Sequence, residues 1–187
     1  MVRYILASNS PRRKELLAGL GLDFLVRVID GIDESYPAGI PVSDVAQYIA
    51  QKKADAYRSS MAPDELIITA DTVVIVGSEI LGKPKDEADA VRMLSALSGR
   101  THQVTTGVCL LTAQKQVAFS VTTDVTFKQL TSAEIHHYVS EYRPFDKAGA
   151  YGIQEWIGYI GVTGLNGSYY NVMGLPVQRI YTELQKF

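Results

Sequence analysis

The chain has 187 residues, of which 47% are hydrophobic and 20% are charged, a composition typical of one ordinary globular domain. No apolar run approaches the roughly 18 to 20 residues that span a bilayer, and the first residues turn polar too soon for a signal peptide. The formal net charge of −2 argues against a basic protein that coats nucleic acid. We expect a soluble, cytoplasmic protein that binds any anion through a local cluster of cations.

Short apolar runs bounded by turn residues predict strands, and apolar residues at helical spacing predict helices between them. The predicted strands are 3–7, 24–29, 66–76, 103–112 and 117–127, with a hairpin near Gln114 joining the last two. The predicted helices are 11–20, 42–58, 86–97, one opened by the capping box Thr131-x-x-Glu134 through Val139, and one from Pro176 through Leu184. This order favours an α/β or α+β fold with a mixed sheet, in a single domain, 1–187, without an internal linker.

The first candidate site is the turn between the first strand and the first helix, Ser8 to Arg13. Ser10 can cap the helix, and free backbone N–H groups at such a turn bind anions. Arg12, Arg13 and Lys14 follow at once, which is the wrong sign for the helix dipole, so a negative partner is expected. A polyphosphate fits, because the arginine fork matches phosphate oxygens. The alternative is a solvated helix start partly neutralised by Glu15.

The second candidate is Asp71, the one carboxylate inside the hydrophobic strand 66–76. An ionised acid buried there needs a cation, a metal or several hydrogen-bond donors. It could hold magnesium or act as a general base toward water. The structural alternative is a bulge at which Asp71 bonds to turn backbone.

Three glycine-flanked segments provide further polar groups. Lys83 follows the acidic strand and its hairpin, and Lys147 and Gln154 lie in one segment whose glycines let backbone approach a ligand closely. The loop 167–176 is the third, with a plain turn as the alternative. Each lysine, taken alone, is also compatible with a solubilising surface position.

Other features exclude common classes of site. His136 and His137 are adjacent, so they cannot share a helix face as zinc ligands, and His102 is distant in sequence. The sequence has neither a G-x-S-x-G elbow nor a G-x-x-x-x-G-K-[ST] loop, which disfavours a serine hydrolase and a P-loop enzyme. The single cysteine, Cys109, has no disulfide partner and is expected in the core.

Six blocks along the chain together resemble the Maf family of nucleotide pyrophosphatases, in order and over nearly the whole length. They are Ser8-Asn9-Ser10-Pro11-Arg12-Arg13, Ala70-Asp71-Thr72, Gly82-Lys83-Pro84, Asp124-Val125-Thr126-Phe127, Asp146 to Gln154, and Gly167 to Pro176. The resemblance implies a Maf/ITPase-like α/β fold, with a mixed twisted sheet flanked by helices and two lobes around a central cleft. It also implies hydrolysis between the α- and β-phosphates, assisted by a divalent cation, Mg²⁺ or Mn²⁺.

The resemblance also assigns roles to individual residues. Asp71 matches the family's proton acceptor, and the form Tyr151-Gly152-Ile153-Gln154 is similar to the branch that prefers dTTP and UTP; modified pyrimidine nucleotides are further candidate substrates. The resulting hypothesis has catalytic residues Asp71, Lys83, Lys53 and Arg13, substrate-binding residues Arg12, Thr72, Gln154, Ser8, Ser10 and Lys147, and metal ligands Asp71 and Glu34. The expected partners are the nucleotide and, as an open alternative to a monomer, a second copy in a homodimer; no membrane and no stable nucleic-acid complex are expected.

The chain departs from the family pattern at three places. Lys52 stands where the family commonly has glutamate, Tyr142-Arg143 where it has Gly-Glu, and Glu155 where it has glycine. If a missing glutamate binds the metal, the metal geometry or base preference would differ. The rival functions are a non-catalytic nucleotide sensor linked to cell division, a pyrophosphatase of non-canonical purine or methylated GTP nucleotides, and a nucleic-acid-binding module.

Overall fold

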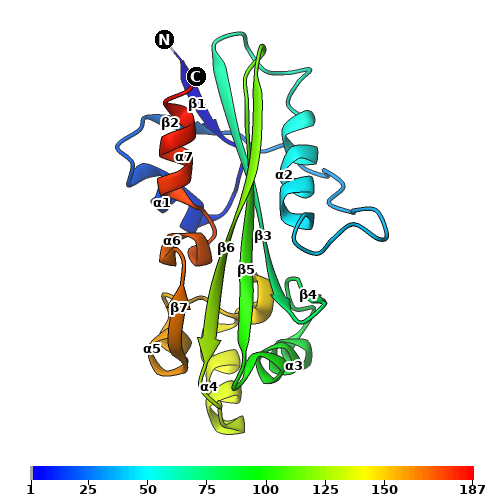
Figure 1. The fold of residues 1–187 in the computed structure, drawn as a ribbon, viewed down its shortest axis with the longest axis vertical. Helices are drawn as coiled ribbons and strands as arrows, with labels where there is room; N and C mark the ends of the chain where they lie inside the picture. The colour runs from blue at the N-terminus through cyan, green and yellow to red at the C-terminus, as the bar shows by residue number, and fades with distance from the viewer. Residues whose placement is uncertain (1) are drawn as a thin grey trace. The chain divides into compact units, whose positions relative to one another are not determined.

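The computed structural model describes residues 2–187 and divides them into two compact units. Unit 1 consists of the chain up to Thr72 together with Thr106–Val121 and Gly174–Phe187, and unit 2 of Val73–Thr105 and Thr122–Met173. Three long strands contribute residues to both units: β3 (Glu65–Val76), β5 (Thr101–Leu111) and β6 (Gln116–Phe127) (Figure 1).

The strands form one seven-stranded mixed sheet in the order β2-β1-β3-β5-β6-β7, with β4 paired to β3. β1 (Arg3–Leu6) pairs in parallel with β2 (Phe24–Val26) on one side and β3 on the other. β4 (Glu79–Leu81) is antiparallel to β3, and β7 (Val162–Asn166) is antiparallel to β6. The predicted mixed α/β architecture is therefore confirmed.

Unit 1 contains α1 (Pro11–Ala18), α2 (Val45–Asp55) and α7 (Val177–Leu184) around its part of the sheet (Figure 1). Ile5 and Ile67 of the parallel pair pack with Ala50, Tyr57 and other residues of one buried cluster. Cys109 lies in the same cluster, as predicted, and burial raises the pKa of its thiol to about 12.

The backbone of α2 lies directly against β5 at Gly107. A Cβ atom at this position would come within 2.3 Å of the carbonyl group of Ala46 and the amide nitrogen of Gln47. Only glycine permits such an approach, because the helix backbone cannot yield as a flexible side chain could. The glycine therefore sets how closely α2, and the side chains on its inner face, lie against the sheet.

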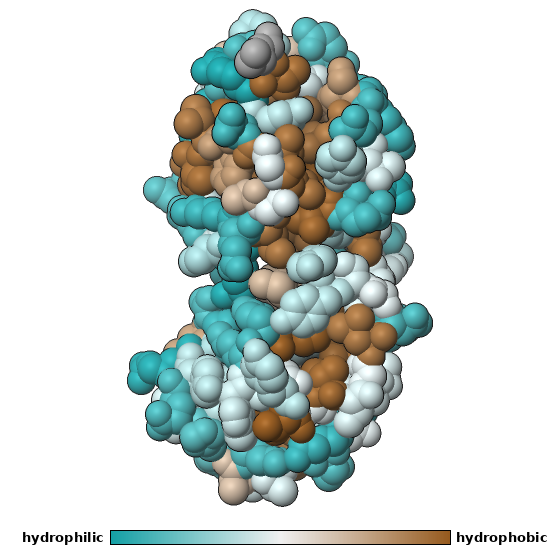
Figure 2. All heavy atoms as spheres, turned by 90° about the vertical axis from the view of Figure 1, so that its left-hand side faces the viewer, coloured by the Kyte–Doolittle hydropathy of each residue, from teal (hydrophilic) through white to brown (hydrophobic). Residues whose placement is uncertain are grey.

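The edge strand β2 leaves hydrophobic side chains exposed. Leu25 is 60% exposed, and Val26 and, just after the strand, Val28 are exposed as well. Figure 2 views the side of the molecule on which β2 lies and shows hydrophobic surface there. Within residues 2–187 no helix is long and apolar enough to cross a membrane.

Unit 2 contains α3 (Glu87–Leu97), α4 (Ser132–Tyr142), the 3₁₀ turn η1 (Ala148–Ala150), α5 (Trp156–Gly161) and α6 (Tyr169–Met173). Its core joins the inner faces of α3 and α4 to β3, β5 and β6, and includes Leu94, Phe127 and Tyr138. Thr131 and Glu134 form the predicted capping box at the start of α4.

Long periodic elements agree with the sequence predictions, and short glycine-containing ones do not. The strands and helices predicted in the first 142 residues are present, with ends shifted by a few residues, and so is the final helix. β7, α5 and α6 were not predicted. They are five or six residues long, and the first two contain glycine. Neither the helical nor the strand spacing of apolar residues repeats often enough in so short a segment to predict the element. The segment around Tyr169 is thus a short helix and not a plain turn.

A buried histidine lies in the core of unit 2. His102 of β5 is 1% exposed and contacts the rings of Phe127 and Tyr151, and its Nε2 lies 2.6 Å from the Tyr151 hydroxyl. Its Nδ1 has no hydrogen-bond partner among the described residues. Desolvation lowers the pKa of His102 from 6.5 to about 4, so the folded protein holds the neutral ring.

This burial predicts a loss of stability in mild acid. Because the folded pKa lies below the unfolded one, the unfolded chain binds the proton more readily as pH falls from 6.5 toward 4. Between pH 7 and pH 5 His102 should lower the free energy of unfolding by about 2 kcal/mol. Urea unfolding of wild type and His102→Gln at both pH values measures this. Between pH 7 and pH 5 the variant should lose correspondingly less free energy of unfolding than wild type. Equal losses would contradict a lowered pKa of His102 in the folded protein.

Candidate active site

The predicted strand-to-helix turn lies where β1 ends. The amide of Ala7 donates to the Ile68 carbonyl at 2.9 Å, and the chain then leaves the sheet. Ser8 Oγ accepts from the amide of Ser10 at 3.2 Å, and Ser10 caps α1 by accepting from the amide of Arg13. The carboxyl end of a strand in an open α/β sheet is the usual place for a ligand.

Arg13 ties this turn to β3 and to the segment before α7. Its guanidinium donates to the carbonyl of Gly174 at 2.8 Å, to the carbonyl of Ala70 at 3.0 Å and to Thr72 Oγ1 at 3.1 Å. The Ala70 carbonyl lies two residues beyond the Ile68 carbonyl, which accepts the last hydrogen bond from the chain after β1. The Arg13 guanidinium therefore donates to a carbonyl of β3 that β1 is too short to reach. The sequence predicted a phosphate partner for this cation, and the structure gives it protein partners.

The electrostatic surroundings of Arg13 connect it to the other charged residues of unit 1. Desolvation lowers its pKa, while the negative charges of Asp71 and Glu34 act in the opposite direction and the positive charge of Arg12 lowers it further. Arg12, in the first turn of α1, therefore belongs to the same charged group. Thr72 Oγ1, which accepts from Arg13, also lies 2.9 Å from Thr106 Oγ1. Thr106 was not predicted, because a threonine in a buried strand carries no sequence signal of its own.

Asp71, Lys53 and Glu34 form an ion-pair triad. Lys53 Nζ lies 2.8 Å from Asp71 Oδ1 and 3.1 Å from Glu34 Oε1. The side chains of Lys53 and Asp71 are each 14% exposed, whereas that of Glu34 is 56% exposed. Of the cation, metal or hydrogen-bond donors expected for Asp71, the structure shows a cation, Lys53. Asp71 lies inside β3, and its carboxylate accepts a hydrogen bond from Lys53 Nζ and not from turn backbone.

The sequence of α2 explains why Lys53 reaches Asp71. Ala46, Ile49 and Ala50 are buried on the inner face of the helix, and Lys53 lies on the same face, one turn farther on. Thr69 Oγ1 donates to the Ala50 carbonyl at 2.6 Å. Since alternate residues of a strand point to the same side, Thr69 and Asp71 both face α2. Thr72 points to the opposite side, where Arg13 binds it.

The neighbouring Lys52 holds the loop that carries Glu34. Its Nζ lies 2.6 Å from Asp33 Oδ2 and donates to the carbonyl of Ser35 at 3.0 Å. The bond to Lys52 is the main cause of a strongly lowered pKa of Asp33. Two consecutive lysines of α2 thus hold two consecutive acids of the loop, and the departure from the family pattern at Lys52 has a defined contact.

A second polar cluster lies in unit 2. Lys147, which is 9% exposed, contacts Asp146 Oδ1 at 2.9 Å and Glu155 Oε1 at 3.1 Å. Glu155 also accepts from the Tyr138 hydroxyl, which in turn accepts from the amide of Gly152 at 3.0 Å. Glu155 therefore fixes Lys147 in place. The sequence indicates Glu155 only as a departure from the family pattern and predicts no contact for it.

Gly152 brings Lys147 and Gln154 close together. A Cβ atom at Gly152 would lie 3.1 Å from Lys147 Cε and 3.2 Å from Gln154 Nε2, so a larger residue would push both side chains apart. Gln154 Oε1 is buried and has no hydrogen-bond partner among residues 2–187. An amide in this state is able to accept a bond from a ligand. Lys83 is exposed in the turn after β4.

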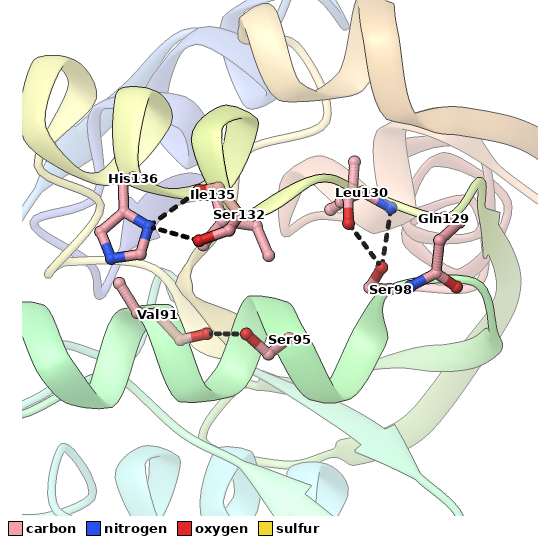
Figure 3. A pocket seen from close by; sticks show the side chains of 8 residues that line it. All are labelled: Val91, Ser95, Ser98, Gln129, Leu130, Ser132, Ile135 and His136. Atoms are coloured by element: carbon pink, nitrogen blue, oxygen red, sulfur yellow. Dashed lines mark hydrogen bonds between the residues drawn. The ribbon is translucent and has the colours of Figure 1, made fainter.

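A pocket of about 180 Å³ between α3 and α4 contains none of the predicted site residues (Figure 3). Its hydroxyl groups are already bonded: Ser95 Oγ donates to the Val91 carbonyl, and Ser98 Oγ accepts from the amide of Leu130. Ligand sites for molecules of nucleotide size are usually about 300 Å³ or larger. This pocket is therefore not a candidate active site.

The carboxylates of unit 1 fit a magnesium site that is completed by a ligand. Among the described residues no group of three or more acidic, histidine or cysteine side chains could hold a metal. Mg²⁺, however, is commonly bound by one or two carboxylates together with substrate phosphates. Asp71 and Glu34, brought to one ammonium group, provide such a pair of hard oxygen ligands.

Comparisons with known proteins find relatives of this chain in sequence and in fold. The family model described as "Maf-like protein" matches residues 3–187. A protein of Phocaeicola vulgatus named dTTP/UTP pyrophosphatase is 59% identical over 98% of this chain and 95% of its own length. One of the same name from Bacteroides thetaiotaomicron is 57% identical over 97% and 94%. A HAM1 protein from Coxiella burnetii is similar in fold, with a TM-score of 0.55, 15% identity and full coverage of both chains.

The Lys52 contacts predict a local effect on the loop. Replacing Lys52 by Met removes the bonds to Asp33 and Ser35, so the amide of Ser35, which donates to Asp33 Oδ1, should exchange its hydrogen a few-fold faster. Hydrogen–deuterium exchange of the 30–36 peptide measures this. Arg58→Met, which removes an exposed ion pair with Asp55 at the end of the same helix, is the matched control. Equal exchange in both variants would contradict a holding role for Lys52.

Proposed function

Since the chain belongs to the family of Maf-like proteins, we propose that it is a pyrophosphatase that hydrolyses dTTP and UTP to the monophosphate and pyrophosphate. Two relatives with more than half of their residues identical carry that activity in their names. The observation that carries the proposal within the chain is the Asp71–Lys53–Glu34 triad. It places an acid with little exposure, a cation and a second acid beside the turn at the end of β1.

Asp71 is the group that orients or deprotonates the attacking water. Its carboxylate is held on one side by Lys53, so it has a fixed direction before any substrate binds. The water attacks the α-phosphorus, the bond from that phosphorus to the bridging oxygen breaks, and pyrophosphate leaves. Phosphoryl transfer depends mainly on positioning and on charge stabilisation, which suits a site made of one base and several cations.

The proposed phosphate-binding groups of unit 1 are Arg12 and the capped turn of Ser8 and Ser10 at the carboxyl end of β1, and Arg13 holds this turn in place. In unit 2, Lys83 and Lys147 are proposed as further phosphate-binding cations. A divalent cation bound by Asp71 and Glu34 would neutralise charge on the phosphate oxygens.

Gln154 is proposed to recognise the pyrimidine base. Its buried Oε1 lacks a partner within residues 2–187. This oxygen could accept a hydrogen bond from the N3–H group of thymine or uracil. Arg12 and Thr72 complete the proposed set for substrate choice. A cytoplasmic location fits this function, since the substrates are intracellular nucleotides and the lone Cys109 requires no oxidising compartment.

A panel of nucleotides tests the proposed function. We expect pyrophosphate release from dTTP and UTP with Mg²⁺ or Mn²⁺, and much less from ITP and methylated GTP. Binding of dTTP without pyrophosphate release under either metal would instead indicate a nucleotide sensor. Preferred hydrolysis of ITP or methylated GTP would indicate instead a pyrophosphatase of non-canonical purine or methylated GTP nucleotides.

Asp71→Asn tests the base. The substitution keeps the shape of the side chain and removes its charge, so dTTP should still bind, while turnover falls by about 10²- to 10⁴-fold. Pyrophosphate release and equilibrium binding of dTTP are measured on the same preparation. Asp55→Asn, which changes an exposed acid on α2 outside the triad, is the control and should leave turnover unchanged. Full turnover in Asp71→Asn would reject the assignment.

A further inference from the structure

Lys53 occupies the position between the two carboxylates that a metal ion would otherwise join. Its ammonium lies 2.8 Å from Asp71 Oδ1 and 3.1 Å from Glu34 Oε1, and only 14% of its side chain is exposed. Both contacts are ion pairs, and the one with Asp71 is also a hydrogen bond. Each acid therefore already has a counter-ion from the protein.

The charges around the triad oppose the entry of a metal ion alone. The positive groups Arg13 and Lys53 and the negative groups Asp71 and Glu34 lie within electrostatic range of one another, since Asp71 and Glu34 act on the pKa of Arg13 and Lys53 contacts both acids. These four charges balance. Lys52 and Asp33 neutralise each other and do not change this balance. A divalent cation would therefore add uncompensated positive charge, and it would have to displace an ammonium group to reach both carboxylates.

A triphosphate changes that balance, because it brings several negative charges that the cations can bind. Lys53 has a flexible four-carbon side chain and lies two residues before the end of α2. Its ammonium can therefore turn from the carboxylates to phosphate oxygens without movement of the helix. Asp71 and Glu34 are then left without their counter-ion, next to phosphate oxygens that complete a magnesium site.

We propose that Lys53 is the resident counter-ion of the Asp71–Glu34 pair and excludes divalent metal from the site until a triphosphate draws its ammonium away. The identity of the triphosphate rests on the function proposed above, whereas the exclusion of metal does not. A purely structural ion pair would make a different prediction. Its loss would lower stability and leave metal affinity unchanged or weaker.

The test measures Mn²⁺ binding without nucleotide. In Lys53→Met the two carboxylates lose their counter-ion, so the variant should bind Mn²⁺ at least about tenfold more tightly than wild type, a change of about 1.4 kcal/mol. Titration followed by the electron paramagnetic resonance signal of free Mn²⁺ gives both affinities. Arg58→Met, which removes one positive charge of unit 1 outside the triad, should bind as wild type does.

Two further variants make the result decisive. Lys53→Met combined with Asp71→Asn should lose the gain, because one of the two carboxylates is gone. If circular dichroism shows that Lys53→Met is unfolded, Lys53→Gln gives the same measurement with a neutral polar side chain. Mn²⁺ binding by the folded variant that is no tighter than in wild type overturns the proposal. Tighter binding in a protein that releases no pyrophosphate from dTTP or UTP would reject the proposed function and leave this inference standing.

Discussion

The ion pair between Lys53 and Asp71 is the interaction on which the site depends. A carboxylate in the middle of a buried strand is tolerated only with a cation at hydrogen-bonding distance, and α2 provides one at 2.8 Å. That contact requires α2 to lie close to the sheet, which Gly107 permits by having no side chain. The packing of α2 and the chemistry of the site therefore depend on each other. A larger residue at position 107 would push α2 outward and would also separate Lys53 from Asp71.

Neighbouring residues of β3 point to opposite faces of the sheet and make different contacts. Asp71 faces α2, where its charge is neutralised by Lys53, and Thr72 faces the side on which Arg13 binds. Arg13 holds the turn after β1 through two backbone carbonyls and Thr72, so the helix start that can receive phosphate is fixed by a partly buried cation. A residue that looks from its sequence like a phosphate ligand therefore serves first to build the site.

The three departures from the family pattern have local physical explanations. Lys52 binds Asp33 and the Ser35 carbonyl, and so fixes the loop that presents Glu34. Glu155 joins Lys147 to Tyr138 within unit 2. Arg143 ends α4 with φ of 46°, a left-handed conformation more usual for glycine, and lies over the ring of Phe145.

The sequence by itself determined the class of fold, the long strands and helices, and the residue types able to bind phosphate and metal, because periodicity, capping residues and a lone acid in an apolar strand are local signals. It predicted that Asp71 needs a cation, a metal or several hydrogen-bond donors, but not which of these. Only the tertiary structure decided that Lys53 is this cation, that Arg13 binds backbone carbonyls, and that Thr106, Tyr138 and Glu155 take part. Those pairings join residues far apart in the chain, and no local pattern specifies which distant side chains the packing of helices on a sheet will bring within hydrogen-bonding distance.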